Sequence, residues 1–285
     1  MSVSMEEIKE LRTKTGAGVL DCKKALIESN GDIEEAVSFL RKKGLAKAAK
    51  KSGRSTTEGL VVSNKAEEGK DIFMLAVMCE TDFVARTDEF KAFAVSVTEN
   101  TQKDVTETNK AVAIPDDVIE KHKEEVTQAV AKIGENIQLG DYAKFSLSDT
   151  GKIYDYTHFT GKIGVAVELL SNQVSERLDE LGKNICLHIA AFSPDFVSGD
   201  EIDEEVLNKE REIYTEQMKE SGKPEKIIAN IVEGKIRKFK EERCLLSQGF
   251  ALDESKTVQD LVDECAKEIG EKITVKRFAR VSIGD

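Results

Sequence analysis

The sequence contains no tryptophan and only three histidines among its 285 residues. Because histidine is the side chain that most often transfers protons near neutral pH, the chain offers few candidates for acid–base catalysis. It also lacks a Gly-x-x-x-x-Gly-Lys-Ser/Thr loop, the motif that cradles nucleotide phosphates, so we do not expect it to hydrolyse a nucleotide itself.

Cysteine is also sparse. The five cysteines are odd in number and never form a Cys-x-x-Cys pair, so neither a disulfide framework nor a zinc site is indicated. We expect reduced structural thiols at all five positions and neither a metal nor a cofactor. These positions are Cys22, Cys79, Cys186, Cys244 and Cys265.

Long apolar runs and an excess of positive charge are missing as well. No stretch approaches the ~20 apolar residues that span a bilayer, and the amino terminus has no signal-peptide pattern. The net charge of −12 argues against a broad nucleic-acid surface, because phosphate binding depends on clustered Lys and Arg. We therefore expect a cytoplasmic protein that contacts no membrane and no nucleic acid directly.

The amino-terminal residues 1–46 have the pattern of three short helices. Ser4 with Glu7 forms a capping box at the start of the first helix, and Asp32 with Glu35 repeats this pattern at the third. The third helix is expected to close near Gly44. A compact three-helix domain is therefore predicted.

Residues 47–58 lose the apolar period and gain four basic side chains. We interpret this segment as a basic linker, because solvated tethers more often have this composition than binding sites do. The basic residues are Lys47, Lys50, Lys51 and Arg54.

A strand–strand–helix pattern then occurs twice, and it predicts an α+β fold. In residues 59–150 a hairpin with a buried second strand precedes helices near Phe90 and from Pro115, and residues 151–285 begin with another hairpin and a long helix. Since strands and helices do not alternate one by one, antiparallel sheets covered by helices are favoured over a doubly wound parallel sheet. The two segments are predicted to be the amino- and carboxy-terminal subdomains of a two-part core.

Residues 202–243 within the second segment contain two helical stretches separated by Ser-Gly-Lys-Pro at 221–224. Their apolar stripes are thin and flanked by charge, which suits two helices packed on each other. A protruding antiparallel helical hairpin, a coiled coil reaching roughly 30 Å, is expected.

Several segments of the sequence resemble the elongation factor Ts family. LRTKTGAGVLDCKKAL and NGDIEEAVSFLRKKG are similar to its first signature, and CETDFVAR is similar to its second. AKIGENI, LHIAA and SGKPEKI resemble core and hairpin-turn segments. LLSQGFALDESKTV resembles the segment after the coiled coil, although Gly249 stands where many members have proline.

This resemblance spans essentially the whole chain and implies a fold and a function. The first domain is expected to be a ubiquitin-associated-like bundle. The protein is expected to be a guanine-nucleotide exchange factor that releases GDP from elongation factor Tu during translation elongation, without covalent chemistry of its own. It would stay on the nucleotide-free GTPase until GTP binds.

The segment Thr81-Asp82-Phe83-Val84 is the main candidate site, a short surface connection between a strand and a helix. From the residues alone, Phe83 folds back into the core and Asp82 caps a turn. The resemblance implies instead that the tetrapeptide intrudes beside the magnesium and nucleotide site of the GTPase. Phe83 would be the wedge, and Asp82 its polar neighbour.

Four further residues are candidates for partner contact. The resemblance places Arg12, Val19 and Leu20 where the first domain touches the GTPase, whereas the residues alone are equally consistent with a solvated Arg and two core residues. His188 lies on an apolar helix face, which favours a hydrogen-bonded core histidine, although the resemblance implies a position near the partner.

Two other classes of function remain open from the sequence. A non-exchanging adaptor would use the three-helix domain and the hairpin only to hold proteins. A thiol enzyme built on Cys79 or Cys22 is less favoured, because no histidine lies near either cysteine in sequence and no nucleophile signature is present. The stoichiometry is also open, with a dimer of heterodimers as one possibility.

Overall fold

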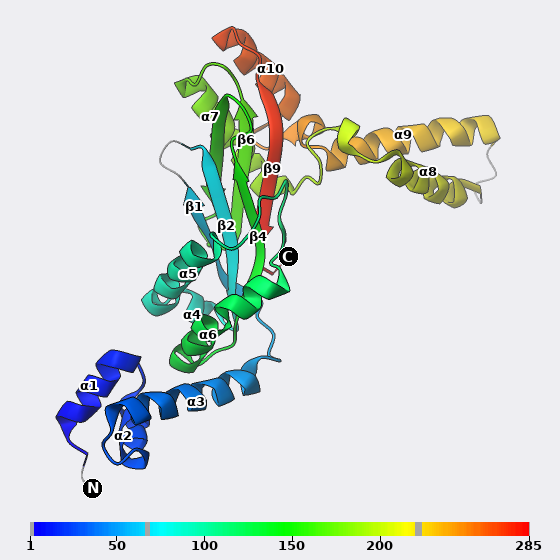
Figure 1. Ribbon diagram of the computed structural model, residues 1–285. Coiled ribbons are helices and arrows are strands. Elements are labelled where there is room, and N and C mark those ends of the chain that lie inside the picture. The colour runs from blue at the N-terminus through cyan, green and yellow to red at the C-terminus, as the bar shows by residue number, and fades with distance from the viewer. Residues whose placement is uncertain (1–2, 66–68, 220–223, 285) are drawn as a thin grey trace.

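The computed structural model describes residues 3–65, 69–219 and 224–284 (Figure 1). It has an α+β fold, in which a bundle of helices precedes two antiparallel sheets covered by helices, as the strand–strand–helix pattern predicts. The amino-terminal bundle contains α1 (Met5–Thr15), α2 (Val19–Glu28) and α3 (Ile33–Lys51). Its core is formed by Ile8, Leu11, Cys22, Ala25, Leu26 and Ala36.

Local hydrogen bonds fix the starts of these helices. The predicted capping box is present, because the Glu7 carboxylate accepts from the Ser4 N–H at 2.7 Å and Ser4 Oγ accepts from the Glu7 N–H at 3.1 Å. At α3 the Asp32 carboxylate accepts from the Glu35 N–H at 2.8 Å. Each bond satisfies a backbone donor that has no partner inside its helix.

The third helix does not end near Gly44, as the sequence suggests, but continues to Lys51. Gly44 packs against α6 (Asp116–Ile133), where a Cβ at this position would lie 3.1 Å from the Ala131 Cβ. The Lys51 ammonium donates to the Gly134 carbonyl beyond the end of α6. Packing against α6 thus outweighs the weak helix propensity of glycine, and the first five residues of the predicted linker are helical.

The first sheet has the strand order β1-β2-β4-β3, with every neighbouring pair antiparallel. The predicted hairpin is confirmed, and its second strand is buried along most of its length. The central strand β4 was not predicted, because Gly140-Asp141 interrupts its apolar alternation. The strands are β1 (Glu58–Lys65), β2 (Asp71–Cys79), β3 (Val112–Ala113) and β4 (Ile137–Ser146).

The second sheet packs against the first, and each sheet has helices on its outer face. It has the order β5-β6-β9. Alternate residues of β2 divide between two cores, with Phe73 facing the helices of the first sheet and Met74 facing the second sheet. The elements are α4 (Asp82–Ala85), α5 (Asp88–Thr101) and α6 over the first sheet; β5 (Gly151–Thr157), β6 (Ile163–Leu170) and β9 (Thr274–Ser282) in the second; and α7 (Glu176–Phe192) and α10 (Val258–Ile269) over the second.

Two helices, α8 (Glu204–Lys219) and α9 (Glu225–Arg243), run beside each other and project from the side of the molecule (Figure 1). The two helices and the residues directly before and after them form a small core, which contains Ile202, Leu207, Ile236 and Cys244. Of the predicted turn at 221–224, residues 221–223 lie outside the described residues. Short elements connect the pair to the core, namely η1 (Gly199–Glu201), η2 (Leu245–Ser247), β7 (Gly249–Phe250) and β8 (Asp253–Thr257).

A buried ion pair within the second sheet is also hydrogen-bonded to the first sheet. Arg277 of β9 donates from Nε to the Glu168 carboxylate of β6 at 2.6 Å and from Nη2 to the Ser146 carbonyl of β4 at 2.6 Å. The other oxygen of Glu168, which is completely buried, accepts from Ser148 Oγ at 2.7 Å. The Arg277 guanidinium also lies 4.6 Å from the centre of the Phe145 ring. The Glu168 carboxylate therefore has its hydrogen-bond partners in Arg277 and Ser148, and burial excludes water as a replacement.

We expect Arg277→Met to lower the free energy of unfolding by about 3–5 kcal/mol, because it leaves the Glu168 carboxylate buried without its partner. The matched control is Arg177→Met, which removes an arginine whose partner Glu268 is exposed and should cost about 1 kcal/mol or less. Urea unfolding of both variants measures the difference, and equal losses would contradict this role of the buried pair.

Replacing residues 205–240 by a short Gly-Ser linker should leave the two-sheet core folded. The α8–α9 pair has its own small core and contributes little to the three large cores of the sheets. The deletion variant should unfold in one cooperative transition in urea. A broad, non-cooperative transition would show that the helical pair is required for the core.

Candidate functional site

The segment Thr81–Val84 lies in the turn that joins β2 to α5, and it comprises the N-cap and the first three residues of the single helical turn α4. Thr81 is the N-cap residue, because its Oγ1 accepts from the Val84 N–H at 3.3 Å. Asp82 does not cap the turn, in contrast to one interpretation of the sequence. Its carboxylate forms an ion pair with Arg86 Nη2 at 2.9 Å, one helical turn further on.

The side chains of this turn point in two directions. Val84 and Ala85 pack into the core between the first sheet and its helices, whereas the Phe83 ring is 80% exposed. The interpretation that Phe83 folds back into the core is therefore wrong. The turn therefore holds an exposed aromatic ring on a base that is anchored in the core.

Three residues that the sequence did not single out hold this turn in place. Glu135 accepts hydrogen bonds from Glu80 and Thr81, and Glu80 accepts one from the Asn136 backbone. This last bond is the main reason why the pKa of Glu80 lies below its ordinary value. In the sequence, Gly134 marks only the end of α6, where it adopts a left-handed conformation, and nothing local indicates that the next two residues meet β2.

Arg12 lies in the last turn of α1, and Val19 and Leu20 lie in the first turn of α2. All three are exposed, Leu20 by 83%, so the interpretation that Val19 and Leu20 are core residues is wrong. Gly16, with φ of 64°, ends α1 and allows the chain to reverse there. The bundle presents these residues on its own surface, separate from the turn of Phe83.

His188 of α7 is completely buried, as expected for a hydrogen-bonded core histidine. Its Nδ1 accepts from the Ala251 N–H at 3.2 Å, so the proton of the neutral ring lies on Nε2 and is donated to Gln248 Oε1 at 2.9 Å. Its ring stacks on Phe192 with centroids 4.8 Å apart. His188 lies on the outer face of the second sheet, so the fold does not bring it to Phe83. Nearness to a partner stays a prediction.

The cysteines do not have the surroundings of nucleophiles. All five are buried and free, and burial raises the pKa of Cys79 to about 12, with a smaller effect from the nearby Glu135 carboxylate. Burial also raises the pKa of Cys22. Reactive cysteines have a lowered pKa, so both residues argue against a thiol enzyme. Within the described ranges, no cluster of three or more His, Cys, Asp or Glu side chains could hold a metal ion.

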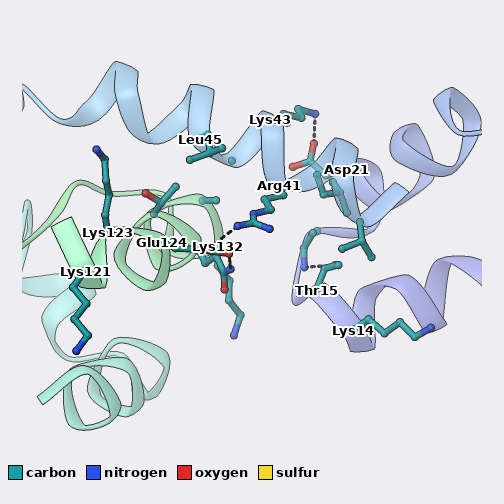
Figure 2. Close-up of a pocket in the computed structure, with 18 of the residues that line it drawn as sticks. Lys14, Thr15, Asp21, Arg41, Lys43, Leu45, Lys121, Lys123, Glu124 and Lys132 are labelled. Atoms are coloured by element: carbon teal, nitrogen blue, oxygen red, sulfur yellow. Dashed lines mark hydrogen bonds and ion pairs between the residues drawn. The ribbon is translucent and has the colours of Figure 1, made fainter. Parts of the chain in front are cut away.

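A cleft of about 830 Å³ lies between the amino-terminal bundle and α6 (Figure 2). Arg41 of α3 crosses it to reach the Glu124 carboxylate of α6 at 2.6 Å, and Lys43 pairs with Asp21 on the side of the bundle at 2.6 Å. The cleft is therefore lined by charges that pair with each other, and it marks where the bundle rests on the core. Across 3–65, 69–219 and 224–284, no helix has the length and apolarity to cross a membrane.

Comparison with known proteins agrees with these features. The family model described as elongation factor TS matches residues 80–285. The chain is 43% identical to elongation factor Ts of Clostridium botulinum (strain Alaska E43), covering 99% of this chain and 93% of that protein. It is 42% identical to elongation factor Ts of Desulfovibrio desulfuricans, covering 99% and 98% of the two chains. For Clostridium acetobutylicum elongation factor Ts the identity is 43%, over 99% and 93%.

These matches define a nucleotide exchange factor of translation elongation rather than an enzyme. The chain belongs to the elongation factor Ts family, so the GTPase on which it acts is elongation factor Tu. The adaptor and the thiol enzyme, which the sequence alone left open, are not retained.

The buried His188 should make stability depend on pH. Burial lowers its pKa in the folded protein below the ordinary 6.5, so the unfolded chain binds the proton more readily. The contribution of the neutral His188 ring to the free energy of unfolding is therefore present at pH 7. It is lost as the pH falls below about 6.5, the pKa in the unfolded chain, toward the pKa of His188 in the folded protein. Urea unfolding should show a larger loss between pH 7 and pH 5 in the wild type than in His188→Gln. An equal pH dependence of both would contradict this assignment.

Proposed function

We propose that Phe83 is the wedge by which this exchange factor disturbs the magnesium and phosphate site of elongation factor Tu. One observation carries the proposal, namely that a large apolar ring is 80% exposed on a turn whose base is held by packing and hydrogen bonds. An exposed ring of this size gains most of its binding energy in a partner's pocket. Thr81 and Val84 anchor the turn on this chain, and Asp82, the polar neighbour of Phe83 in sequence, pairs with Arg86.

The physical consequence of such a wedge is the release of GDP. In a GTPase the phosphates are held by backbone amides and by Mg²⁺, which bridges protein and phosphate oxygens. Displacing the ion leaves phosphate charge unneutralised. An aromatic anchor can contribute several kcal/mol, and each 1.4 kcal/mol directed against GDP weakens its binding about tenfold.

Linkage makes this coupling reciprocal. A factor that favours the nucleotide-free GTPase is itself expelled when a nucleotide binds, by the same coupling free energy. The proposed cycle is therefore binding to the GDP form, release of GDP, and persistence on the empty GTPase until GTP enters. No covalent bond forms or breaks on this chain.

A second contact with elongation factor Tu is proposed for Arg12, Val19 and Leu20. All three side chains are exposed, arginine is enriched at protein interfaces, and burial of the two apolar side chains would favour association. His188 would act only indirectly, because it is buried, by holding the segment from Gln248 to Ala251 against α7.

Finer features of the protein are proposed on the same basis. The amino-terminal bundle would be ubiquitin-associated-like, α8 and α9 would pack as a coiled coil, and the protein would act in the cytoplasm. A dimer of heterodimers with elongation factor Tu is the corresponding proposal for the assembly. Sedimentation of the purified complex would distinguish it from a single heterodimer.

Phe83→Ala should slow the release of GDP from elongation factor Tu by about tenfold or more, because it removes the anchor of the wedge. It should change the free energy of unfolding by about 0.5 kcal/mol or less, since the ring is exposed. The measurements are release of a fluorescent GDP analogue and urea unfolding of the same variant.

Two matched variants complete this test. Phe90→Ala truncates a fully buried ring and should cost about 3–5 kcal/mol of stability. Val174→Ala truncates an exposed apolar side chain in the connection before α7, away from α4, and should leave exchange unchanged. The proposal is wrong if Phe83→Ala, while folded, releases GDP at the wild-type rate.

A further inference from the structure

Three segments of the chain meet at the base of the Phe83 turn. They are the end of β2 with the start of α4, the connection from α6 to β4, and the stretch that follows α3. Glu135 lies in the second segment. Its Oε2 accepts from the backbone N–H groups of Glu80 at 3.1 Å and Thr81 at 3.0 Å, and its Oε1 accepts from Thr81 Oγ1 at 2.7 Å.

Glu80 and Asn136 form further hydrogen bonds between the same three segments. The Glu80 carboxylate accepts from the Asn136 N–H at 2.7 Å and from Arg54 Nη1 at 3.2 Å. The Asn136 side chain donates to the carbonyl of Arg54 at 2.8 Å and that of Ser52 at 3.4 Å. We call this set of bonds the carboxylate clasp. It links the base of the turn to the segment through which the amino-terminal bundle is attached.

Beyond the end of β2, the carboxylate clasp supplies the hydrogen-bond acceptors that neighbouring strands supply within the sheet. Cys79 is the last residue of β2 paired with β1 and β4, so the N–H groups of Glu80 and Thr81 have no strand partner. A carboxylate is a strong acceptor for such donors, because its hydrogen bonds are charge-assisted. Glu135 therefore determines the direction in which the chain leaves the sheet.

The same carboxylate also fixes the side chain that starts α4. Thr81 Oγ1 donates its proton to Glu135 and accepts from the Val84 N–H, so its rotamer and the first turn of the helix are set together. Phe83 lies within this turn. A ring that must enter a partner's pocket gains from such preorganisation, because less conformational entropy is lost on binding.

We propose that Glu135 is the positioning residue of the exchange wedge, acting on elongation factor Tu through the orientation of Phe83. This inference rests on the proposed role of Phe83. Glu135 itself is only partly buried and need not contact the GTPase. Its effect on exchange is therefore expected to depend on the presence of the Phe83 ring.

A double-mutant cycle tests this dependence, because residues that act through each other are not additive. Glu135→Ala should slow GDP release about tenfold in the wild-type background and produce no further loss in the Phe83→Ala background. The loss should appear in the maximal rate at saturating factor more than in the concentration of factor that gives half of that rate. A general structural defect would instead slow both backgrounds by the same factor.

The conservative variant Glu135→Gln should restore most of the rate. The amide oxygen can still accept from the two backbone N–H groups, while the amide nitrogen donates to Thr81 Oγ1, which can also act as an acceptor. Glu120→Gln is the matched control for removal of a negative charge, since Glu120 pairs with Lys123 on the same helix and should leave exchange unchanged. If Glu135→Ala does not fold, Thr81→Val replaces it, with Thr81→Ser as its control.

The outcomes separate the two proposals. If Phe83→Ala is slow but Glu135→Ala exchanges at the wild-type rate, the positioning role is overturned and the wedge stands. Equal slowing by Glu135→Ala in both backgrounds also overturns the positioning role. If Phe83→Ala itself exchanges at the wild-type rate, the wedge is refuted, and the role of Glu135 is overturned with it.

Discussion

Burial of β2 on both faces is the constraint on which the rest of the structure depends. Phe73, Leu75 and Val77 pack against helices, and Ile72, Met74 and Ala76 pack against the second sheet. A strand held in this way cannot shift its register without exposing one of its two apolar sets. The place where β2 ends is thereby fixed, and with it the origin of the Phe83 turn.

The turn that follows β2 has a firmly held base and an exposed side chain, Phe83. Its base is held by Val84, by Ala85 and by the carboxylate clasp around Glu135, whereas Phe83 makes no comparable contact with its own core. A rigid base and an exposed ring are what an exchange factor needs, because it must place one side chain in a partner without chemistry of its own. The amino-terminal bundle rests on α6 through α3, and α6 is the helix that leads into Glu135.

Much of the fold could be predicted from the sequence because its signals are local. The capping box at Ser4 and the apolar second strand of the first hairpin depend on neighbouring residues, and both were confirmed. Strand β4 and the extension of α3 to Lys51 depend on packing against distant segments, which local patterns do not encode. For the site, the sequence identified the turn of Phe83 but left its exposure undecided. Glu135 could not be predicted, because its role arises only when α6 and β2 meet.

The proposed disturbance of the magnesium site is tested most directly by measuring release of a fluorescent GDP analogue from elongation factor Tu with Mg²⁺ and with a chelator. If Phe83 acts by displacing the ion, wild-type factor should far exceed Phe83→Ala when Mg²⁺ is present. The two should approach the same rate once the ion has been removed. An unchanged ratio between the two factors in chelator would contradict the account, because the ring would then act on GDP by a route that does not involve the metal.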